Sequence, residues 1–410
     1  MAIVVQKYGG TSVGDVDRVK RVADRVARSH HDGNQTVVVV SAMGKTTDDL
    51  VSMASRISDE PPRRELDILL TSGERISMSL LAMALAERGV KAKSFTGSQA
   101  GIITDAVHGS ARILEMTPGR VQEALDDGNV VIVAGFSGVS QDTKDVTTLG
   151  RGGSDTTAVA LAAALDADVC EIYTDVDGVF TADPRIEPSA RKLDQLSYEE
   201  MLELAAQGAK VLMVRSVEFG RNHGVRIHVR SSFSYTAGTL VGPEEDIVED
   251  AIISGVAHDT SEAKLTIQAV PDQPGIAAQL FSTLADGNVN VDMIVQNVSA
   301  DGHTAISFTL PRGDSVVARG LLEPLVSEIG AGEIIIDDNV GKVSLVGAGM
   351  KTDPGVAAKM FRALSDADVN IEMISTSTIR VSVVVAKDDV EKAVQVIHRA
   401  FDLGDTQEVS

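Results

Sequence analysis

The stretch IVVQKYGGTS, residues 3–12, indicates the architecture of the N-terminal half. Its first residues predict a short buried strand, and two glycines then turn the chain toward a helical pattern that begins at Val16. Lys7 ends the strand. Because ligands collect at the carboxyl ends of strands in open parallel sheets, this turn is a candidate site for an anionic ligand.

The same alternation of apolar runs and helical patterns continues through residues 1–241 and predicts an α/β domain with a largely parallel sheet. The expected strands are 3–7, 36–40, 130–134, 170–174 and 225–229. The expected helices are 16–30, 65–88, 117–127, 155–165 and 198–206.

Composition narrows the class of protein. The chain has 410 residues, of which 43% are apolar, so it is long enough for several folded domains. Lys and Arg number 37 against 59 Asp and Glu, and this net charge of -22 argues against nucleic-acid or anionic-membrane binding. No apolar run approaches the ~20 residues of a membrane span and the N-terminus lacks a signal-peptide pattern, so we expect a cytoplasmic protein. The single cysteine, Cys170, excludes a disulfide framework and reads as a small buried residue.

The C-terminal part contains an internal repeat. Residues 274–294 align without gaps on 354–374, with eleven of 21 positions identical. Each copy begins at a Pro-Gly turn, continues through a helix into strands, and predicts a βαββαβ module. The first copy ends in a further strand at 333–337, whereas the second copy has no such strand after its helix at 390–401.

A strand-like segment upstream of both modules can supply the strand that the second copy lacks. The apolar segment 251–257 has no partner of its own, so we expect it to complete the second module. The predicted organisation is an α/β domain at 1–241, a linker at 242–262 that includes this strand, a first module at 263–339 and a second module at 340–410.

The stretch VVSAMGKT, residues 39–46, imitates a phosphate-binding P-loop. A P-loop needs a glycine five positions before Gly44, so that successive backbone N–H groups wrap the phosphates, but that position is Val39. We therefore do not assign a P-loop. The adjacent histidines His30 and His31 are likewise not assigned to a metal, because neighbouring side chains on a helix diverge.

A second glycine-rich turn, TLGRGGSD at residues 148–155, leads into a helix. Lys7 beside the first turn and Arg151 inside the second supply the positive charge that ATP and an anionic substrate need. Together the two turns favour a phosphoryl-transfer site over two unrelated surface loops.

Several motifs carry a family resemblance that covers essentially the whole chain. The segments 7–12, 72–75, 94–101, 151–155 and 174–185 resemble those of aspartate kinases within the amino-acid kinase fold. The C-terminal repeat resembles the paired ACT modules of that family, with residues 296–299 and 374–377 at the family's usual places. The resemblance implies a three-layer αβα kinase domain with a mostly parallel sheet, followed by two ferredoxin-like βαββαβ ACT modules.

The implied activity is ATP-dependent phosphorylation of the side-chain carboxylate of L-aspartate to 4-phospho-L-aspartate, the first step of lysine, threonine and methionine biosynthesis. The implied cofactors are ATP and Mg²⁺, the latter bound mainly through the nucleotide and not by a metal site of the protein. The attacking carboxylate is already ionised near pH 7, so catalysis needs alignment and charge stabilisation and no general base.

The resemblance also assigns residues. The implied catalytic residues are Lys7, Asp155 and Glu74. The implied ATP-binding residues are Lys7, Tyr8, Gly9, Gly10, Ser154, Thr174, Asp175, Phe180, Thr181, Asp183, Pro184, Arg185 and Lys210. The implied aspartate-binding residues are Ser41, Thr47, Glu74, Arg151, Gly152 and Gly153.

The ACT modules imply feedback inhibition by lysine, threonine or both. The implied effector-binding residues are Asp272, Pro274, Gly275, Ala277, Asn290, Val291, Asp292, Gln296, Asp353, Pro354, Gly355, Val356, Asn370, Ile371 and Thr378. Thr378 departs from the family pattern, in which Glu is expected. A homo-oligomer formed through the ACT modules is expected, and the sequence leaves open whether an internal start near Val248 also makes a separate regulatory chain.

Two alternatives stay open at this point. One is another enzyme of the same fold that phosphorylates glutamate, acetylglutamate, carbamate or a nucleotide. The other is a non-catalytic amino-acid sensor built on a degenerate kinase domain, although the presence of Lys7, Glu74, Arg151 and Asp155 speaks against it.

Overall fold

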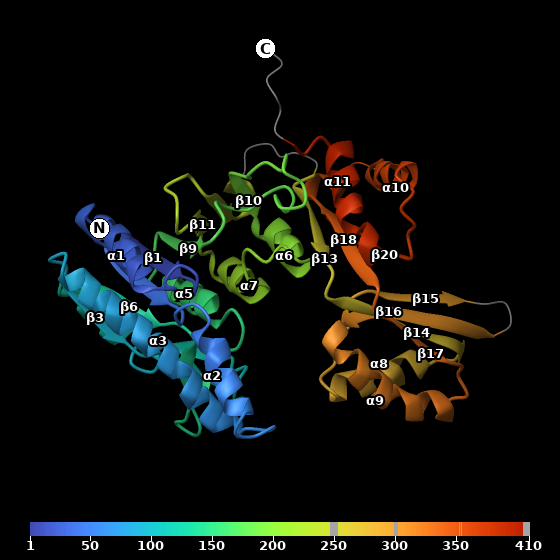
Figure 1. The fold of residues 1–410 in the computed structure, drawn as a ribbon, viewed down its shortest axis with the longest axis horizontal. Coiled ribbons are helices and arrows are strands. Elements are labelled where there is room, and N and C mark those ends of the chain that lie inside the picture. The colour runs from blue at the N-terminus through green and yellow to red at the C-terminus, as the bar shows by residue number, and fades with distance from the viewer. Residues whose placement is uncertain (247–252, 299–301, 352, 354, 405–410) are drawn as a thin grey trace, which may run out of the picture. The chain divides into compact units, whose positions relative to one another are not determined.

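The computed structural model describes residues 1–246, 253–298, 302–351, 353 and 355–404 (Figure 1). They form two compact units. The first comprises Met1–Val179, Lys192–Ala205 and Lys210–Val248, and the second comprises Phe180–Arg191, Ala206–Ala209 and Glu249–Ser410.

The first unit is built on an eight-stranded sheet with the strand order β10-β12-β11-β9-β1-β2-β6-β3. All neighbouring strands run parallel except β11 and β12, which are antiparallel. The strands are β1 (Ile3–Tyr8), β2 (Gln35–Val40), β3 (Ala92–Phe95), β6 (Val130–Ala134), β9 (Val169–Thr174), β10 (Gln195–Ser197), β11 (Ile227–Ser231) and β12 (Thr239–Gly242). The prediction of a mostly parallel sheet is confirmed.

Helices cover both faces of this sheet, which gives the expected three layers. On one face α1 and α3 pack together over a core that contains Val26, Leu81 and Ile132. On the other face α5 contacts β1, β2 and β9 and packs against α7. The helices of this unit are α1 (Val16–His31), α2 (Thr46–Ser55), α3 (Arg63–Ala86), α4 (Gly119–Asp126), α5 (Gly153–Ala164), α6 (Tyr198–Ala206) and α7 (Val214–His223), and a 3-10 turn, η1, spans Glu244–Asp246.

A second, smaller sheet in the first unit has the strand order β5-β4-β7-β8. Its strands are β4 (Ile102–Thr104), β5 (Ile113–Met116), β7 (Ser137–Ser140) and β8 (Val146–Thr148). The β7-β8 hairpin is antiparallel and delivers the chain directly into the turn before α5. None of these short strands was predicted, because three or four residues are too few to show a clear strand periodicity.

The long helix α3 is apolar enough, by length and composition, to cross a membrane. Its most apolar window is 44% buried inside the structure, and two acidic residues of the helix, Asp67 and Glu74, are both buried. These features are those of a core helix that packs against α1 and the sheet.

The second unit contains two four-stranded antiparallel sheets, each packed against two helices. The first module has the strand order β15-β16-β14-β17, and the second has β13-β18-β20-β19. The elements of the first module are β14 (Glu262–Pro271), α8 (Ile276–Asp286), β15 (Ile294–Val298), β16 (His303–Pro311), η2 (Arg312–Asp314), α9 (Ser315–Glu328) and β17 (Ile334–Asp337). Those of the second are β13 (Gly255–Asp259), β18 (Val340–Val346), η3 (Ala348–Lys351), α10 (Val356–Asp366), β19 (Met373–Thr376), β20 (Arg380–Ala386), η4 (Lys387–Asp389) and α11 (Val390–Ala400). These are the expected ferredoxin-like sheets.

The strand β13 lies beside β18, antiparallel to it, at the edge of the second sheet. In the first module β17 lies beside β14 at the corresponding edge, also antiparallel. A strand from upstream of both modules therefore fills the position that a C-terminal strand fills in the first copy. Of the segment 251–257, residues 251 and 252 lie outside the described residues, and the strand itself begins at Gly255 and extends to Asp259.

One segment of the predicted first domain, Phe180–Arg191, folds with the second unit. Thr181 is fully buried there, and its hydroxyl lies 2.9 Å from Nε2 of His398 and donates to the carbonyl oxygen of Leu403 at 3.0 Å. Ala190 forms an isolated β-bridge with Gly404. The sequence did not predict this packing.

Candidate active site

The end of β1 and the start of α5 bring two predicted catalytic residues together. Nζ of Lys7 lies 2.5 Å from Oδ1 of Asp155, and the two side chains are 12% and 10% exposed. Asp155 lies in the first turn of α5, where free backbone N–H groups and the positive end of the helix dipole stabilise negative charge. A buried lysine held at a helix N-terminus is suited to contact phosphate oxygens.

The turn before α5 depends on glycine at Gly152. This residue has φ +72° in the left-handed region, and a Cβ atom there would lie 2.2 Å from Cγ of Met213. A larger residue would therefore meet both backbone strain and a clash. Within α5, Oγ of Ser154 lies 2.8 Å from Oγ of Ser41, which links the helix N-terminus to the loop after β2.

The two strand-end turns pack closely. The backbone N–H of Gly44 donates to the carbonyl oxygen of Gly10 at 3.0 Å, and a Cβ on Gly10 would lie 2.9 Å from the carbonyl oxygen of Ala42. The stretch that imitates a P-loop is therefore a neighbour of the Lys7 turn. Glycine at position 10 permits this close approach, which brings Ser41 to the same edge of the sheet as Lys7.

Glu74 supplies an unusual acid from the middle of α3. Its side chain is buried, and Oε2 accepts the backbone N–H of Phe136 at 2.7 Å. Burial raises the pKa of Glu74 to about 8, while that hydrogen bond and the charge of Lys7 act in the opposite direction. Without a bound cation Glu74 therefore holds a proton near pH 7.

The remaining predicted aspartate-binding residues lie nearer the surface. Arg151 is exposed in the turn before α5, and it has no ion pair within the described residues. Thr47 is half-buried in the first turn of α2, and Gly153 is buried at the start of α5. A guanidinium without an internal partner can receive a ligand carboxylate.

The predicted nucleotide residues of the first unit lie at the carboxyl ends of β1 and β9. Thr174 ends β9 and donates from its hydroxyl to Oδ1 of Asp175 at 3.1 Å. The Tyr8 side chain is fully buried and stacks on Tyr173 with ring centroids 4.6 Å apart, so it is not accessible to a nucleotide. Lys210 is exposed.

The other predicted nucleotide residues belong to the second unit, namely Phe180, Thr181, Asp183, Pro184 and Arg185. The Arg185 guanidinium contacts the Asp183 carboxylate at 2.6 Å and holds the pKa of that carboxyl below its usual range. The polar groups of Thr181 all make hydrogen bonds inside this unit. A nucleotide role for these five residues stays a prediction.

A cavity of about 320 Å³ opens at the start of α8 in the first module. It is lined by Asp272, Pro274, Gly275, Ala277 and Gln296 of the predicted effector set, and additionally by Val270, Pro271, Gln273, Ile276 and Ile306. Gly275 has φ +99° and caps α8. The predicted residues from the Pro-Gly turn and from β15 therefore meet at one cavity.

Three further predicted residues do not line this cavity. Val291 packs against the core of the module, and Asn290 is exposed. The Asp292 carboxylate pairs with Lys342 of β18, whose buried Nζ also lies 2.6 Å from Oε1 of Glu262.

The corresponding turn of the second module is arranged differently. Gly355 has φ -81°, and its backbone N–H donates to Oδ1 of Asp353 at 2.8 Å. Val356 is buried in the core, Ile371 packs against it, and Asn370 and Thr378 are exposed. Pro354 lies outside the described residues.

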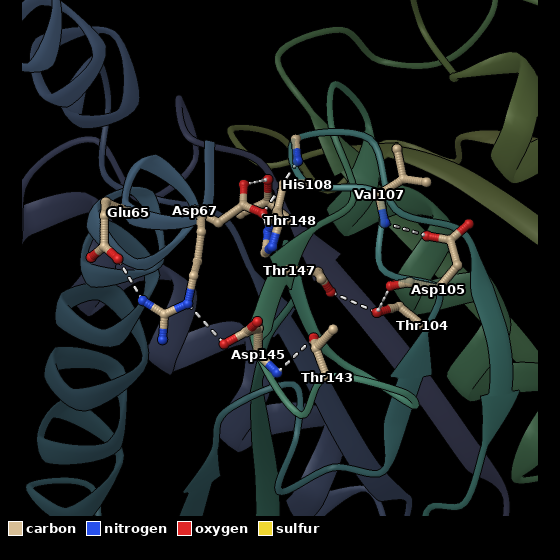
Figure 2. Close-up of polar contacts among 12 residues, drawn as sticks. Glu65, Asp67, Thr104, Asp105, Val107, His108, Thr143, Asp145, Thr147 and Thr148 are labelled. Carbon is tan, nitrogen blue, oxygen red and sulfur yellow. Dashed lines mark hydrogen bonds and ion pairs between the residues drawn. The ribbon is translucent and has the colours of Figure 1, made fainter. Parts of the chain in front are cut away.

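Sequence reasoning missed a buried polar network near the Gly150–Gly152 turn (Figure 2). Asp67 of α3 is 1% exposed, and its carboxylate contacts the side chains of Thr148 and His108. The signal was an acidic residue within an apolar helix, in the sequence Leu66-Asp67-Ile68-Leu69-Leu70. Because buried carboxylates need specific partners, such a residue is informative even where its partners are unknown.

Comparison with known proteins assigns this arrangement to a family. Residues 2–231 match the model of the amino acid kinase family, and residues 268–323 and 343–401 match an ACT domain model. The aspartokinase of Mycolicibacterium smegmatis is 59% identical over 412 residues, which cover 100% of this chain and 98% of that relative.

Solved structures agree with these matches. E. coli aspartokinase III in complex with aspartate and ADP is similar with a TM-score of 0.83 at 27% identity, covering 97% of this chain and 99% of that one. The same enzyme in complex with lysine and aspartate has a TM-score of 0.76 at 27% identity, with the same coverage.

Fold and site therefore define an amino acid kinase that carries ACT domains. The similarity to the M. smegmatis relative extends over the kinase part and the regulatory part alike. The chain belongs to the aspartokinase family.

Proposed function

We propose that the chain transfers the γ-phosphoryl group of ATP to the side-chain carboxylate of L-aspartate. The observation that carries this proposal is the Lys7–Asp155 pair at the N-terminus of α5, with Arg151 in the preceding turn and buried Glu74 in α3. Such a site can hold a substrate with two carboxylates and one ammonium group, because it offers cations and, in Glu74, an acid outside the Lys7–Asp155 pair.

Substrate recognition follows from the charges. Arg151 receives one carboxylate of L-aspartate, and Glu74 meets the ammonium group, with Ser41, Thr47, Gly152 and Gly153 lining the pocket. Since burial raises the pKa of Glu74 to about 8, arrival of the ammonium group drives its proton off. Aspartate binding near pH 7 is thus coupled to proton release.

Phosphoryl transfer needs alignment and charge stabilisation more than proton transfer. Lys7 neutralises phosphate oxygens with the N–H groups of Gly9 and Gly10, and the N-terminus of α5 adds its dipole. Asp155 holds Lys7 in place through the 2.5 Å ion pair. The nucleotide extends toward Thr174, Asp175 and Lys210 of the first unit.

Magnesium fits this site through the nucleotide. Within the described part of the chain no group of three or more His, Cys, Asp or Glu could hold a metal ion by itself. Mg²⁺ is commonly held by one or two carboxylates plus phosphate oxygens, and Asp155 and Asp175 are available for that role. When bound, the ion neutralises charge on the phosphate oxygens.

Two of the similar proteins support the reaction. The M. smegmatis relative is an aspartokinase, and the E. coli structure holds aspartate and ADP. The test is a coupled assay of ADP formation with MgATP and, in parallel, aspartate, glutamate, acetylglutamate, carbamate and a nucleotide. We expect turnover with aspartate only. Turnover with a different acceptor alone would show that this acceptor, and not aspartate, is the substrate. No turnover with any of them would favour a non-catalytic sensor.

We further propose that lysine or threonine binds in the first-module cavity and inhibits the kinase. The N-terminus of α8 offers N–H groups to an α-carboxylate, Asp272 offers a partner for the ammonium group, and Gln296 reads the side chain. The E. coli complex with lysine supports an amino-acid effector. A protein whose modules served only for dimerisation would bind neither amino acid in calorimetry.

Two aspects of the cellular setting complete the proposal. We place the enzyme in the cytoplasm, and we expect a homo-oligomer formed through the ACT modules. Sedimentation with and without lysine tests the oligomer, because an effector that favours one packing of the modules shifts the equilibrium between oligomeric states.

A further inference from the structure

The acid Asp67 lies on the buried face of α3 with three hydrogen-bond donors around it. Oδ1 accepts the hydroxyl of Thr148 at 2.5 Å, and Oδ2 lies 2.7 Å from Nδ1 of His108 and accepts the backbone N–H of Gly109 at 3.2 Å. Figure 2 shows Asp67, His108 and Thr148 pointing toward one another from three separate segments. One carboxylate thereby holds three stretches of chain together.

A buried carboxylate in this position is costly, because it lies in the apolar stretch Leu66–Leu70 of α3. Burying an acid stabilises a fold only when its hydrogen bonds are complete, and an apolar residue of similar size is often equally stabilising. Asp67 is 1% exposed, and Leu70 on the same helix is also buried. The choice of an acid therefore indicates a requirement for a particular geometry and not for packing alone.

The three segments converge on the turn that carries Arg151. Thr148 ends β8 two residues before Gly150. From the other side, the carbonyl oxygen of Gly109 lies 3.1 Å from the position that a Cβ on Gly150 would occupy, so the two loops are in contact. The backbone N–H of Ala111 also donates to the carbonyl oxygen of Thr148 at 2.9 Å.

A residue of α7 also holds the backbone before the Gly150–Gly152 turn. Arg215 donates through one guanidinium nitrogen to the carbonyl oxygen of Leu149 at 3.2 Å and through another to that of Ala111 at 3.1 Å. The backbone between β8 and α5 is therefore held at Thr148 and Leu149. Gly150 and Gly152 follow with φ +75° and +72°, so the direction of the Arg151 side chain depends on where this anchored end lies.

We propose that Asp67 is a positioning residue for substrate binding, which fixes the Gly150–Gly152 turn so that Arg151 faces the aspartate carboxylate. The inference rests on the proposed function, because it takes Arg151 as the group that receives the substrate. Asp67 itself touches neither substrate nor nucleotide. Its effect reaches the reaction through Thr148 on one side and the His108–Gly109 loop on the other.

The consequence is selective for one substrate. Lys7 lies at the end of β1 and makes no contact with this network among the described residues, so ATP binding does not depend on it. Displacing a substrate-positioning group by about 1 Å can reduce the rate roughly 100-fold. Loosening the Arg151 turn should therefore change the KM for aspartate far more than the KM for ATP.

The experiment compares four variants of the full chain by steady-state kinetics and thermal melting. Thr148→Val removes the hydroxyl while keeping the shape, and Thr148→Ser keeps the hydroxyl. Asp67→Asn replaces the carboxylate. Asp145→Asn is the matched control, because Asp145 belongs to the same β7-β8 hairpin region but pairs at 2.8 Å with Arg64, whose side chain is half exposed.

We expect Asp67→Asn and Thr148→Val to raise the KM for aspartate roughly tenfold or more, as expected for a lost hydrogen bond to a charged group, with the KM for ATP within about twofold of wild type. Thr148→Ser should have the wild-type KM for aspartate. The control Asp145→Asn should have the wild-type KM for both aspartate and ATP. If Asp67→Asn does not fold, the Thr148 pair decides the matter.

Three results would overturn the inference. An unchanged KM for aspartate in folded Thr148→Val would remove the positioning role. A parallel fall in all rates, in proportion to the folded fraction, would leave Asp67 as a purely structural residue. A wild-type chain without any aspartate-dependent turnover would overturn the proposed function as well, and this distinguishes the two failures.

Discussion

Two helices of this chain begin at a glycine in the left-handed region, α5 after Gly152 and α8 after Gly275. Both helix ends offer N–H groups and a positive dipole to an anion. Lys7 and Arg151 lie near the N-terminus of α5, whereas the residues that line the cavity at α8 include no Lys or Arg. In the functions that we propose, the same backbone feature serves phosphoryl transfer where cations are added, and recognition of a single α-carboxylate where they are not.

A third helix that follows a glycine, α10, begins at a turn of different geometry. In the second module the turn before α10 has its own acid, and Asp353 accepts the Gly355 N–H at 2.8 Å. Position 353 corresponds to Gln273 of the first copy, which is neutral and lines the cavity. The first copy has Asp272 and Gln273 where the second has Thr352 and Asp353, so two substitutions make the turns chemically different.

The largest effect is expected at Lys7. Lys7→Ala should lower kcat by ~100-fold or more, because a preorganised cation over the phosphates is lost, while the protein stays folded. Lysine binding measured by calorimetry should be unchanged. The matched control is Lys20→Ala, a surface lysine that pairs with Asp17 on α1. Wild-type turnover in folded Lys7→Ala would show that α5 is not the catalytic helix.

The next effect concerns Arg151. Arg151→Leu should raise the KM for aspartate by roughly 10- to 100-fold, since a carboxylate clamp acts on ground state and transition state alike. Initial rates at varied aspartate and fixed ATP provide the measurement, with Arg64→Leu as a surface control. A rise in the KM for ATP alone would assign Arg151 to the nucleotide instead.

A regulatory change should appear at Gln296 without loss of catalysis. Gln296→Ala should keep the uninhibited rate near wild type and raise the inhibitory concentration of lysine or threonine by about one to two orders of magnitude. Thr376→Ala changes the equivalent position of the second module and should leave inhibition intact. Equal effects of the two variants would contradict the asymmetry between the modules.

The smallest effect is a pH-dependent difference in stability at Glu74. Burial raises the pKa of Glu74 from 4.5 to about 8, so the folded state keeps a proton that the unfolded state loses in this range. Stability from this group is complete below about pH 4.5 and is lost as the pH rises through about 8. Glu74→Gln should therefore melt like wild type at about pH 5 and several degrees higher at about pH 9.

The control for this measurement is Glu65→Gln, an exposed acid at the start of the same helix. It should melt with wild type at both pH values. A Glu74→Gln difference that does not depend on pH would mean that Glu74 is ionised throughout.

The elements that could be predicted are those whose periodicity is strong. The strand at Val130–Ala134 and the helix at Tyr198–Ala206 have the expected bounds, whereas the strand expected at 225–229 begins at Ile227. The repeat identified both modules, because the Pro-Gly start and the spacing of core residues are local sequence features.

Features that arise from distant contacts could not be predicted. Thr181 and His398 lie 217 residues apart, so the packing of Phe180–Arg191 with the second unit has no local signal. The Asp67 network likewise joins α3 to Thr148 across 81 residues. The acid Asp67 in the apolar stretch Leu66–Leu70 is a signal in the sequence, but its partners are known only from the fold.

The central claim is that the carboxylate of the aspartate side chain attacks ATP at the Lys7 turn. Its most direct test is to trap the product with hydroxylamine and to identify the hydroxamate while ADP is counted in the same sample. We predict one β-aspartyl hydroxamate for each ADP in the wild type, and almost none of either with Lys7→Ala. ADP formed without any hydroxamate, or a hydroxamate on the α-carboxylate, would contradict the account.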